Sequence, residues 1–230
     1  PWDFGHPGWV NERASGFITA PVKDSLVFEV LAWTPSTRLV ARGQAFQIVL
    51  PQRPTQEELT AYFNTIKTQV RGKMVLMGKP AVVPVNINPN PKRIPDETIR
   101  QRLNPDATPQ PFPTAARAAA PWPKPQPTPR EGQLTFQQIG EQLNDFLVKN
   151  GALVRINDAG REHGQIRAFG NSTYDIKKVI PTVVMRNEDF GRISRILENG
   201  TPVSLEFDIR NKIYPEGKTS YNTIGEITGT

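Results

Sequence analysis

Proline dominates the interval between residues 80 and 130 and limits what this part of the chain can fold into. Fourteen of the 23 prolines in the 230 residues fall there, ending in the alternating run Pro121, Pro123, Pro125, Pro127 and Pro129. Proline has no N–H for a sheet and disfavours helical backbone in the residue before it. We therefore expect extended, polyproline-like backbone with one short helix at residues 96–103. The interval is predicted to be a surface loop on its own domain, and a docking ligand for an aromatic groove is the alternative.

The composition narrows the classes of function. The chain has no cysteine, which excludes disulfides, thiolate metal sites and cysteine nucleophiles. No apolar run approaches the roughly 18 residues of a membrane span, so we expect a soluble protein with no membrane partner. The net charge is +6, but residues 80–130 hold seven basic and three acidic side chains and so account for four of those charges. The rest is nearly neutral, and we do not expect nucleic acid as a partner.

Three amphipathic helices are predicted from their first residues. Thr55 with Glu58, and Thr135 with Gln138, have the spacing of capping boxes. A third helix is predicted to start at Asn187, followed by two acidic residues at the positive end of the helix dipole. The last two helices are expected to end at Asn150-Gly151 and Asn199-Gly200. The apolar faces are predicted to be Leu59, Tyr62, Phe63, Ile66 and Val70; Phe136, Ile139, Leu143, Phe146 and Leu147; and Phe190, Ile193, Ile196 and Leu197.

Strands are predicted in the intervals between these helices. Short apolar runs such as Met74–Met77 are typical of strands covered on both faces. Residues 203–210 alternate between apolar and polar, which predicts one buried and one solvated face. The other expected strands are residues 26–33, 46–50, 153–154 and 181–185. This order of elements predicts an α/β or α+β domain built on a mixed sheet flanked by helices.

No arrangement of catalytic or metal-binding residues is recognisable. The two histidines, His6 and His163, lie in neither a His-Glu-x-x-His nor a His-x-Asp pattern. A Gly-x-Ser-x-Gly elbow, a phosphate-binding loop and a dinucleotide fingerprint are also absent from the sequence. The acidic residues Glu57-Glu58, Glu97 and Glu188-Asp189 stand at predicted helix starts, where the helix dipole explains them. We predict no catalytic, no cofactor-binding and no metal-binding residue in this chain.

Residues 71–210 resemble the protease-associated (PA) domain family. Residues 71–77, Arg-Gly-Lys-Met-Val-Leu-Met, resemble the strand that opens the family's core, and residues 180–185, Ile-Pro-Thr-Val-Val-Met, resemble its Ile-Pro signature. The helix at 136–150, the strand at 151–155, the helix at 187–197 and the strand at 201–210 follow the family's order. The chain departs from the family in its Pro-rich insertion of about 50 residues. The resemblance implies a mixed sheet or open barrel flanked by helices.

The flanking segments resemble a larger enzyme. Residues 221–230, Tyr-Asn-Thr-Ile-Gly-Glu-Ile-Thr-Gly-Thr, resemble the strand that starts the catalytic domain of co-catalytic zinc aminopeptidases of the carboxypeptidase Q and transferrin-receptor type. Residues 2–9 and 32–37 resemble the segment before the PA insertion in bacterial members. The resemblance implies three parts: residues 1–40, partly from the parent catalytic domain; residues 41–214, the PA domain; and residues 215–230, the start of the peptidase domain. Because both flanks border one insertion, we expect residues 2–33 and residues 214–230 to lie close together.

The family's zinc ligands and glutamate base follow the strand that residues 221–230 resemble. The resemblance therefore implies a non-catalytic accessory domain of a secreted or periplasmic zinc aminopeptidase, with no cofactor of its own and two zinc ions in the parent catalytic domain. The implied partners are that peptidase domain, a peptide or protein substrate and a second copy of the chain, and the implied role is a lid or interaction platform. The alternative is an independent module for anionic partners such as nucleic acid, motivated by an isoelectric point near 9.7. A third hypothesis is a complete enzyme with an unrecognised site.

Overall fold

The computed structural model describes residues 5–84, 96–104, 131–217 and 225. One compact unit comprises residues 1–83 and 132–230, and a second comprises residues 84–131. In the second unit the structure describes helix α2 (Asp96–Leu103), which confirms the short helix predicted there. The alternating prolines at 121–129 and most of residues 221–230 lie outside the described residues.

The first unit is built on a mixed sheet, which confirms the predicted fold class. Its eight described strands follow the order β2-β1-β8-β4-β5-β6-β7-β3. The central strands β4 to β7 run parallel to one another, whereas β1, β8 and β3 join the sheet through antiparallel pairs. The strands are β1 (Gly8–Ala20), β2 (Asp24–Ser25), β3 (Phe28–Val30), β4 (Ala41–Ile48), β5 (Met74–Met77), β6 (Val154–Asp158), β7 (Thr182–Met185) and β8 (Ser204–Tyr214).

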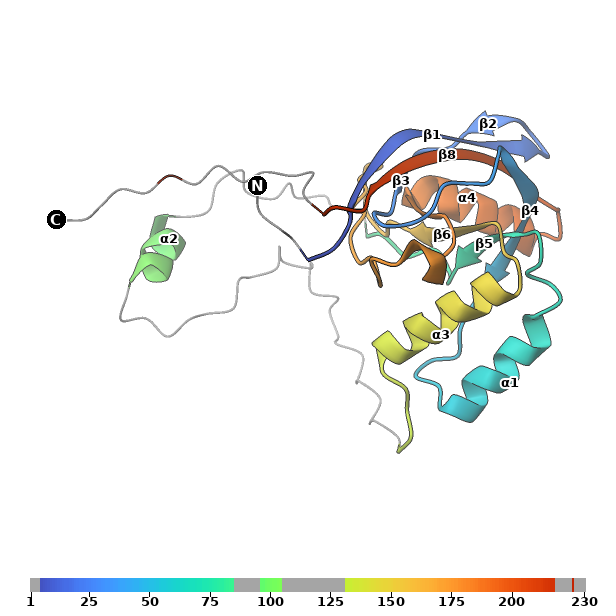
Figure 1. Cartoon of the computed structure of the whole chain (residues 1–230), viewed down its shortest axis with the longest axis horizontal. Helices are drawn as coiled ribbons and strands as arrows, with labels where there is room; N and C mark the ends of the chain where they lie inside the picture. The colour runs from blue at the N-terminus through green and yellow to red at the C-terminus, as the bar shows by residue number, and fades with distance from the viewer. Residues whose placement is uncertain (1–4, 85–95, 105–130, 218–224, 226–230) are drawn as a thin grey trace. The chain divides into compact units, whose positions relative to one another are not determined.

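Helices cover both faces of the parallel strands (Figure 1). On one face α1 (Gln56–Ile66) packs beside α3 (Phe136–Lys149), and the rings of Phe63 and Phe146 stack with centroids 4.3 Å apart. On the other face lies α4 (Asn187–Glu198). A short 3-10 helix, η1 (Ile176–Lys178), precedes β7. Both predicted capping boxes are present, but α4 has Arg186 at its N-cap position without a side-chain cap bond.

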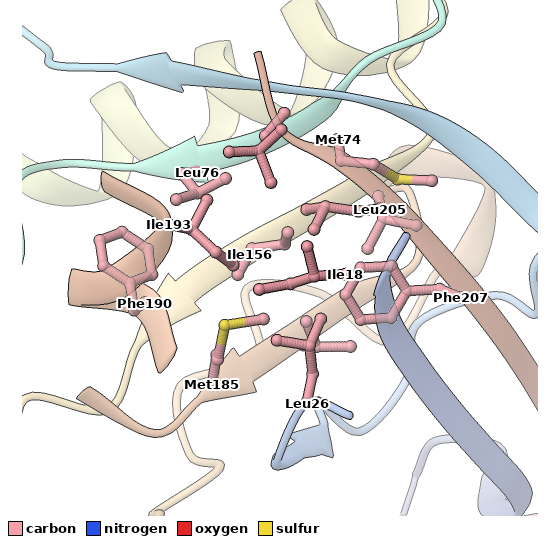
Figure 2. Packing of buried hydrophobic residues seen from close by; sticks show 14 of the residues in the cluster. Ile18, Leu26, Met74, Leu76, Ile156, Met185, Phe190, Ile193, Leu205 and Phe207 are labelled. Carbon is pink, nitrogen blue, oxygen red and sulfur yellow. The ribbon is translucent and has the colours of Figure 1, made fainter. Parts of the chain in front are cut away.

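Alternation along the central strands divides their side chains between two apolar clusters. Met74 and Leu76 of β5 join the cluster under α4, whereas Val75 joins the cluster under α1 and α3. Figure 2 shows Phe190 and Ile193 of α4 in the first cluster, beside Leu76, Ile156 and Met185. Because Val154 and Ile156 of β6 also belong to the α4 cluster, the intervening Arg155 and Asn157 lie on the α3 side of the sheet.

Several sequence expectations were wrong in detail. Strand β1 was not predicted, β4 begins at Ala41 rather than Phe46, and β6 continues to Asp158. Phe136, assigned to the apolar face of α3, is 86% exposed because it is the first helical residue and lies beyond the apolar cluster. Asp208, assigned to a solvated face, is buried and accepts a hydrogen bond from Arg210 Nε at 2.9 Å.

The two flanks of the domain meet at one end of the sheet. Strands β1 and β8 pair in antiparallel fashion, and Gly8 lies opposite Tyr214 in the ladder. This pairing places the first flank beside Tyr214, where the second flank begins; residues 218–224 and 226–230 lie outside the described residues, so the closeness of the two whole flanks stays a prediction. The proposed division at residue 40 stays a prediction, and β1 belongs to the same sheet as β4 to β8. In the described parts of the chain, no helix has the length and apolar content to span a bilayer.

Candidate functional site

The residues with metal-binding potential are dispersed in the described part of the chain. His6 stacks on Tyr174 with ring centroids 4.0 Å apart, and His163 is exposed in a loop with a φ of +58°. Glu188 and Asp189 occupy the first turn of α4, as predicted. Within the described ranges, no three His, Cys, Asp or Glu side chains are grouped so as to hold a metal ion.

A polar cavity of about 420 Å³ opens on the α3 side of the sheet. Its walls come from residues 31–34 after β3, the N-terminal half of α3, strands β6 and β7, and residues 170–173. The size is that of a small-molecule site. The cavity lies where the apolar packing of α3 on the sheet ends, because Asn144 rather than an apolar residue faces β6 there.

Arg155 of β6 lines this cavity and is hydrogen-bonded to two neutral side chains. Its Nε donates to Oδ1 of Asn157 at 3.0 Å, and its Nη1 donates to Oδ1 of Asn144 at 2.9 Å. The Asn144 amide nitrogen in turn donates to the Ser172 hydroxyl oxygen at 2.7 Å. Asn144 is buried, so this network fixes the guanidinium between α3, β6 and the loop that contains Ser172.

The Arg155 charge has no direct counter-ion within the described part of the chain. Among the described residues, no carboxylate oxygen lies within 4.0 Å of its guanidinium nitrogens. Glu141 also lines the cavity, but it is exposed and accepts a hydrogen bond from Gln137 at 2.9 Å. Burial lowers the pKa of Arg155 from its ordinary value, because desolvation disfavours the charged form. A partly buried cation held by neutral amides is an arrangement that an anionic ligand would stabilise.

Several hydrogen-bond donors that line the cavity have no acceptor among the described residues. The guanidinium has five N–H groups, and the two bonds to asparagine leave three of them without a partner among the described residues. Within the same residues, the Asn157 amide nitrogen has no hydrogen-bond acceptor, and the Ser172 hydroxyl accepts a bond without donating one. A group that only accepts hydrogen bonds matches this set of donors.

Aromatic side chains line the cavity beside these donors. Trp33 has a φ of +55°, and its Nε1 donates to the Pro7 carbonyl at 2.7 Å. Its ring lies edge-on to His6 and Tyr174, with centroid distances of 5.0 Å and 4.7 Å. Phe136 lines the cavity from the start of α3 and is exposed. A left-handed backbone is uncommon for a residue as bulky as tryptophan, and such strain is concentrated at functional sites.

The sequence contains one signal that could have located this cavity. Residues 153–158 read Leu-Val-Arg-Ile-Asn-Asp, which places Arg155 and Asn157 on one face of a strand. A central strand that is covered on both faces exposes neither face to water, so an arginine there requires a polar enclosure. Asn144 and Ser172 gave no such signal, because their proximity to Arg155 depends on how α3 and a loop pack.

Comparisons with known proteins assign the chain to no family. No family model and no curated protein matches it. Among solved structures, the chain is similar to a peptidase M28 precursor from Shewanella amazonensis, with 12% sequence identity and a TM-score of 0.47. It is also similar to an aminopeptidase from Aneurinibacillus sp. strain AM-1, with 10% identity and a TM-score of 0.46. A third similar structure is BSAP, a zinc aminopeptidase from Bacillus subtilis, with 10% identity and a TM-score of 0.39. These matches cover 91%, 91% and 90% of this chain but 36%, 34% and 32% of those chains. The chain therefore spans about a third of their length, and at these identities and TM-scores neither family nor function follows.

Proposed function

We propose that the chain is a non-catalytic PA-like domain inserted in a zinc aminopeptidase, where it acts as a lid or interaction platform beside the active site. The proposal extends the resemblance of residues 71–77 and 180–185 to PA domains and of residues 221–230 to the first strand of a peptidase domain. The peptide or protein substrate and the peptidase domain are its proposed partners, and secretion or periplasmic export is its proposed location.

The closeness of Gly8 and Tyr214 is the observation that favours this proposal. Gly8 and Tyr214 are directly opposed in the β1–β8 ladder, so the folded domain begins and ends at one place. A domain inserted in another domain requires this arrangement, because the host chain must leave and re-enter its own fold at one junction. A resident metal or cofactor in this chain forms no part of the proposal.

A deletion designed on this junction tests the proposed role. Opposed residues of an antiparallel ladder have Cα atoms about 5 Å apart, so a short Gly-Ser-Gly linker can replace residues 9–213 in the parent protein. If the domain is a lid, the deletion should leave hydrolysis of a small aminoacyl p-nitroanilide unchanged. It should raise kcat/KM for a long polypeptide substrate roughly tenfold, since a steric barrier is removed.

Zinc content and a melting curve of the deletion protein establish whether its catalytic domain remains intact. In parallel, the 230-residue chain alone should hydrolyse no aminoacyl substrate, with or without added zinc. Hydrolysis by the chain alone would contradict the proposal. An unchanged ratio of the two kcat/KM values in a correctly folded deletion protein would also overturn the lid role, and a parent without a zinc peptidase domain would overturn the whole assignment.

A further inference from the structure

We propose that the cavity around Arg155 is a binding site for a small carboxylate with an adjoining apolar group, such as an N-acylated aromatic amino acid or the C-terminal residue of a peptide. The Arg155 guanidinium would bind the carboxylate, and Trp33 and Phe136 would contact the apolar group. Each of these side chains lines the same cavity. All of the residues that line the cavity belong to this chain, so we expect the site to bind its ligand without the peptidase domain.

The unused donors define the charged part of the ligand. Arg155, Asn157 and Ser172 come from one strand and one loop, and they present N–H and O–H groups for which the described residues supply no acceptor. A carboxylate has two oxygens and no hydrogen to donate, so it can accept from all three side chains. The planar guanidinium also matches the geometry of a carboxylate, and such charge-assisted bonds are stronger than neutral ones.

The number of charges favours a carboxylate over a phosphate. Arg155 is the only lysine or arginine among the residues that line the cavity in the described structure, whereas Glu141 adds a negative charge to the lining. A monoanion neutralises the guanidinium, but a dianion would leave one negative charge near Glu141 without a partner. The aromatic lining gives a further distinction, because inorganic phosphate has no apolar group to place against Trp33 and Phe136.

The test uses nuclear magnetic resonance on the 230-residue chain labelled with nitrogen-15. N-acetyl-L-phenylalanine is titrated while the signals of the Arg155 Nε–H and the Asn157 side-chain amide are followed. We expect both signals to shift with a Kd on the order of 1 mM, which is ordinary for a ligand of this size. N-acetyl-L-phenylalaninamide has the same apolar group without the charge, and it should bind at least about tenfold more weakly.

Two substitutions separate binding from folding. Arg155→Met removes the guanidinium and should abolish the shifts of the Asn157 amide, although it also breaks two hydrogen bonds within the fold. Asn157→Asp avoids this loss because a carboxylate oxygen replaces the Oδ1 that already accepts from Arg155 at 3.0 Å. The variant supplies its own counter-ion, so it should keep the melting temperature and bind N-acetyl-L-phenylalanine at least about tenfold more weakly. Asn64→Asp, an equal change on an exposed position of α1, should bind like the original chain.

Any of the following results would overturn the proposal. The first is an acid and an amide that bind equally well, since the charge would then contribute nothing. The second is an Asn157→Asp variant with unchanged affinity, because Arg155 would then not be the anchor. The third is an absence of shifts at Arg155 and Asn157, or shifts from inorganic phosphate at lower concentration than from N-acetyl-L-phenylalanine, which would contradict the ligand class.

Discussion

Asp189, in the first turn of α4, is only 2% exposed, so its carboxylate depends on protein partners. Arg186 approaches it with two nitrogens, Nε at 2.7 Å and Nη2 at 3.1 Å. Arg192 donates from Nη2 at 3.3 Å, and the Val27 backbone N–H donates at 3.0 Å. The carboxylate therefore ties α4 to the chain between β2 and β3. The bond to Asp189 is also the main reason that the pKa of Arg186 is raised.

Replacing Asp189 by asparagine keeps the volume of the side chain but removes its charge. The new amide group turns one acceptor into a donor, which then faces the N–H groups of Arg186 or Val27. Breaking a buried ion pair by removing one partner destabilises a protein by about 3–5 kcal/mol. Arg186 and Arg192 are each 35% exposed at their side chains and can turn toward water, so we expect about 3 kcal/mol. For a domain of this size that loss lowers the melting temperature by roughly 6–12 °C.

Thermal unfolding followed by circular dichroism measures this effect, and Asp24→Asn provides the control. Asp24 bonds to the same Arg192, and that bond is the main reason that the pKa of its carboxyl is lowered. The Asp24 side chain is half exposed, however, so water can replace the bond and only a small shift is expected. If the melting temperature falls equally in both variants, then the burial of Asp189 does not determine how much its ion pairs stabilise the domain, and the reasoning is refuted.

Two further predictions concern packing and pH. In Gly43→Ala, the new Cβ would lie 2.6 Å from the Gly72 carbonyl oxygen, so urea unfolding should show a free energy of unfolding that is lower by about 1–3 kcal/mol. Gly140→Ala is the control, because no atom lies within 4 Å of the position of its new Cβ, and it should not be destabilised. Burial raises the pKa of the Tyr62 phenol, so its contribution to stability is present below the unfolded pKa of about 10 and is lost as the pH rises further. Between pH 9 and 11 the original chain should therefore lose more stability than Tyr62→Phe, and parallel losses in the two proteins would contradict this account.

Local chemistry explains which elements could be predicted from the sequence. Thr55 and Glu58 form both bonds of their capping box within four residues, so the start of α1 could be predicted from the sequence alone. Strand β1 is different because its partner β8 lies nearly 200 residues away, and residues such as Asn11 and Glu12 have low intrinsic preference for strands. Its length is determined by pairing with β8 and not by its own composition.

The candidate site depended even more on tertiary packing. Arg155 and Asn157 alternate with apolar residues in the sequence, which is equally typical of a solvated strand face. Their role follows only once α3 covers that face and places Asn144 against the guanidinium. Phe136 was misassigned for the same reason: helical spacing placed it on the apolar face, but the apolar cluster does not extend to the first turn of α3.

The β1–β8 ladder also determines how the domain responds to tension at its two ends. Gly8 and Tyr214 lie at the same end of the ladder, so force applied to both flanks would peel the strands apart one pair at a time instead of shearing all the pairs together. The first four pairs end at the register shift after Asn11, whose side-chain amide contacts Asn211 Oδ1 and the carbonyls of Arg13 and Arg210. Peeling should therefore pause there. The four outer pairs would then separate before the strand pairs that border the core under α4.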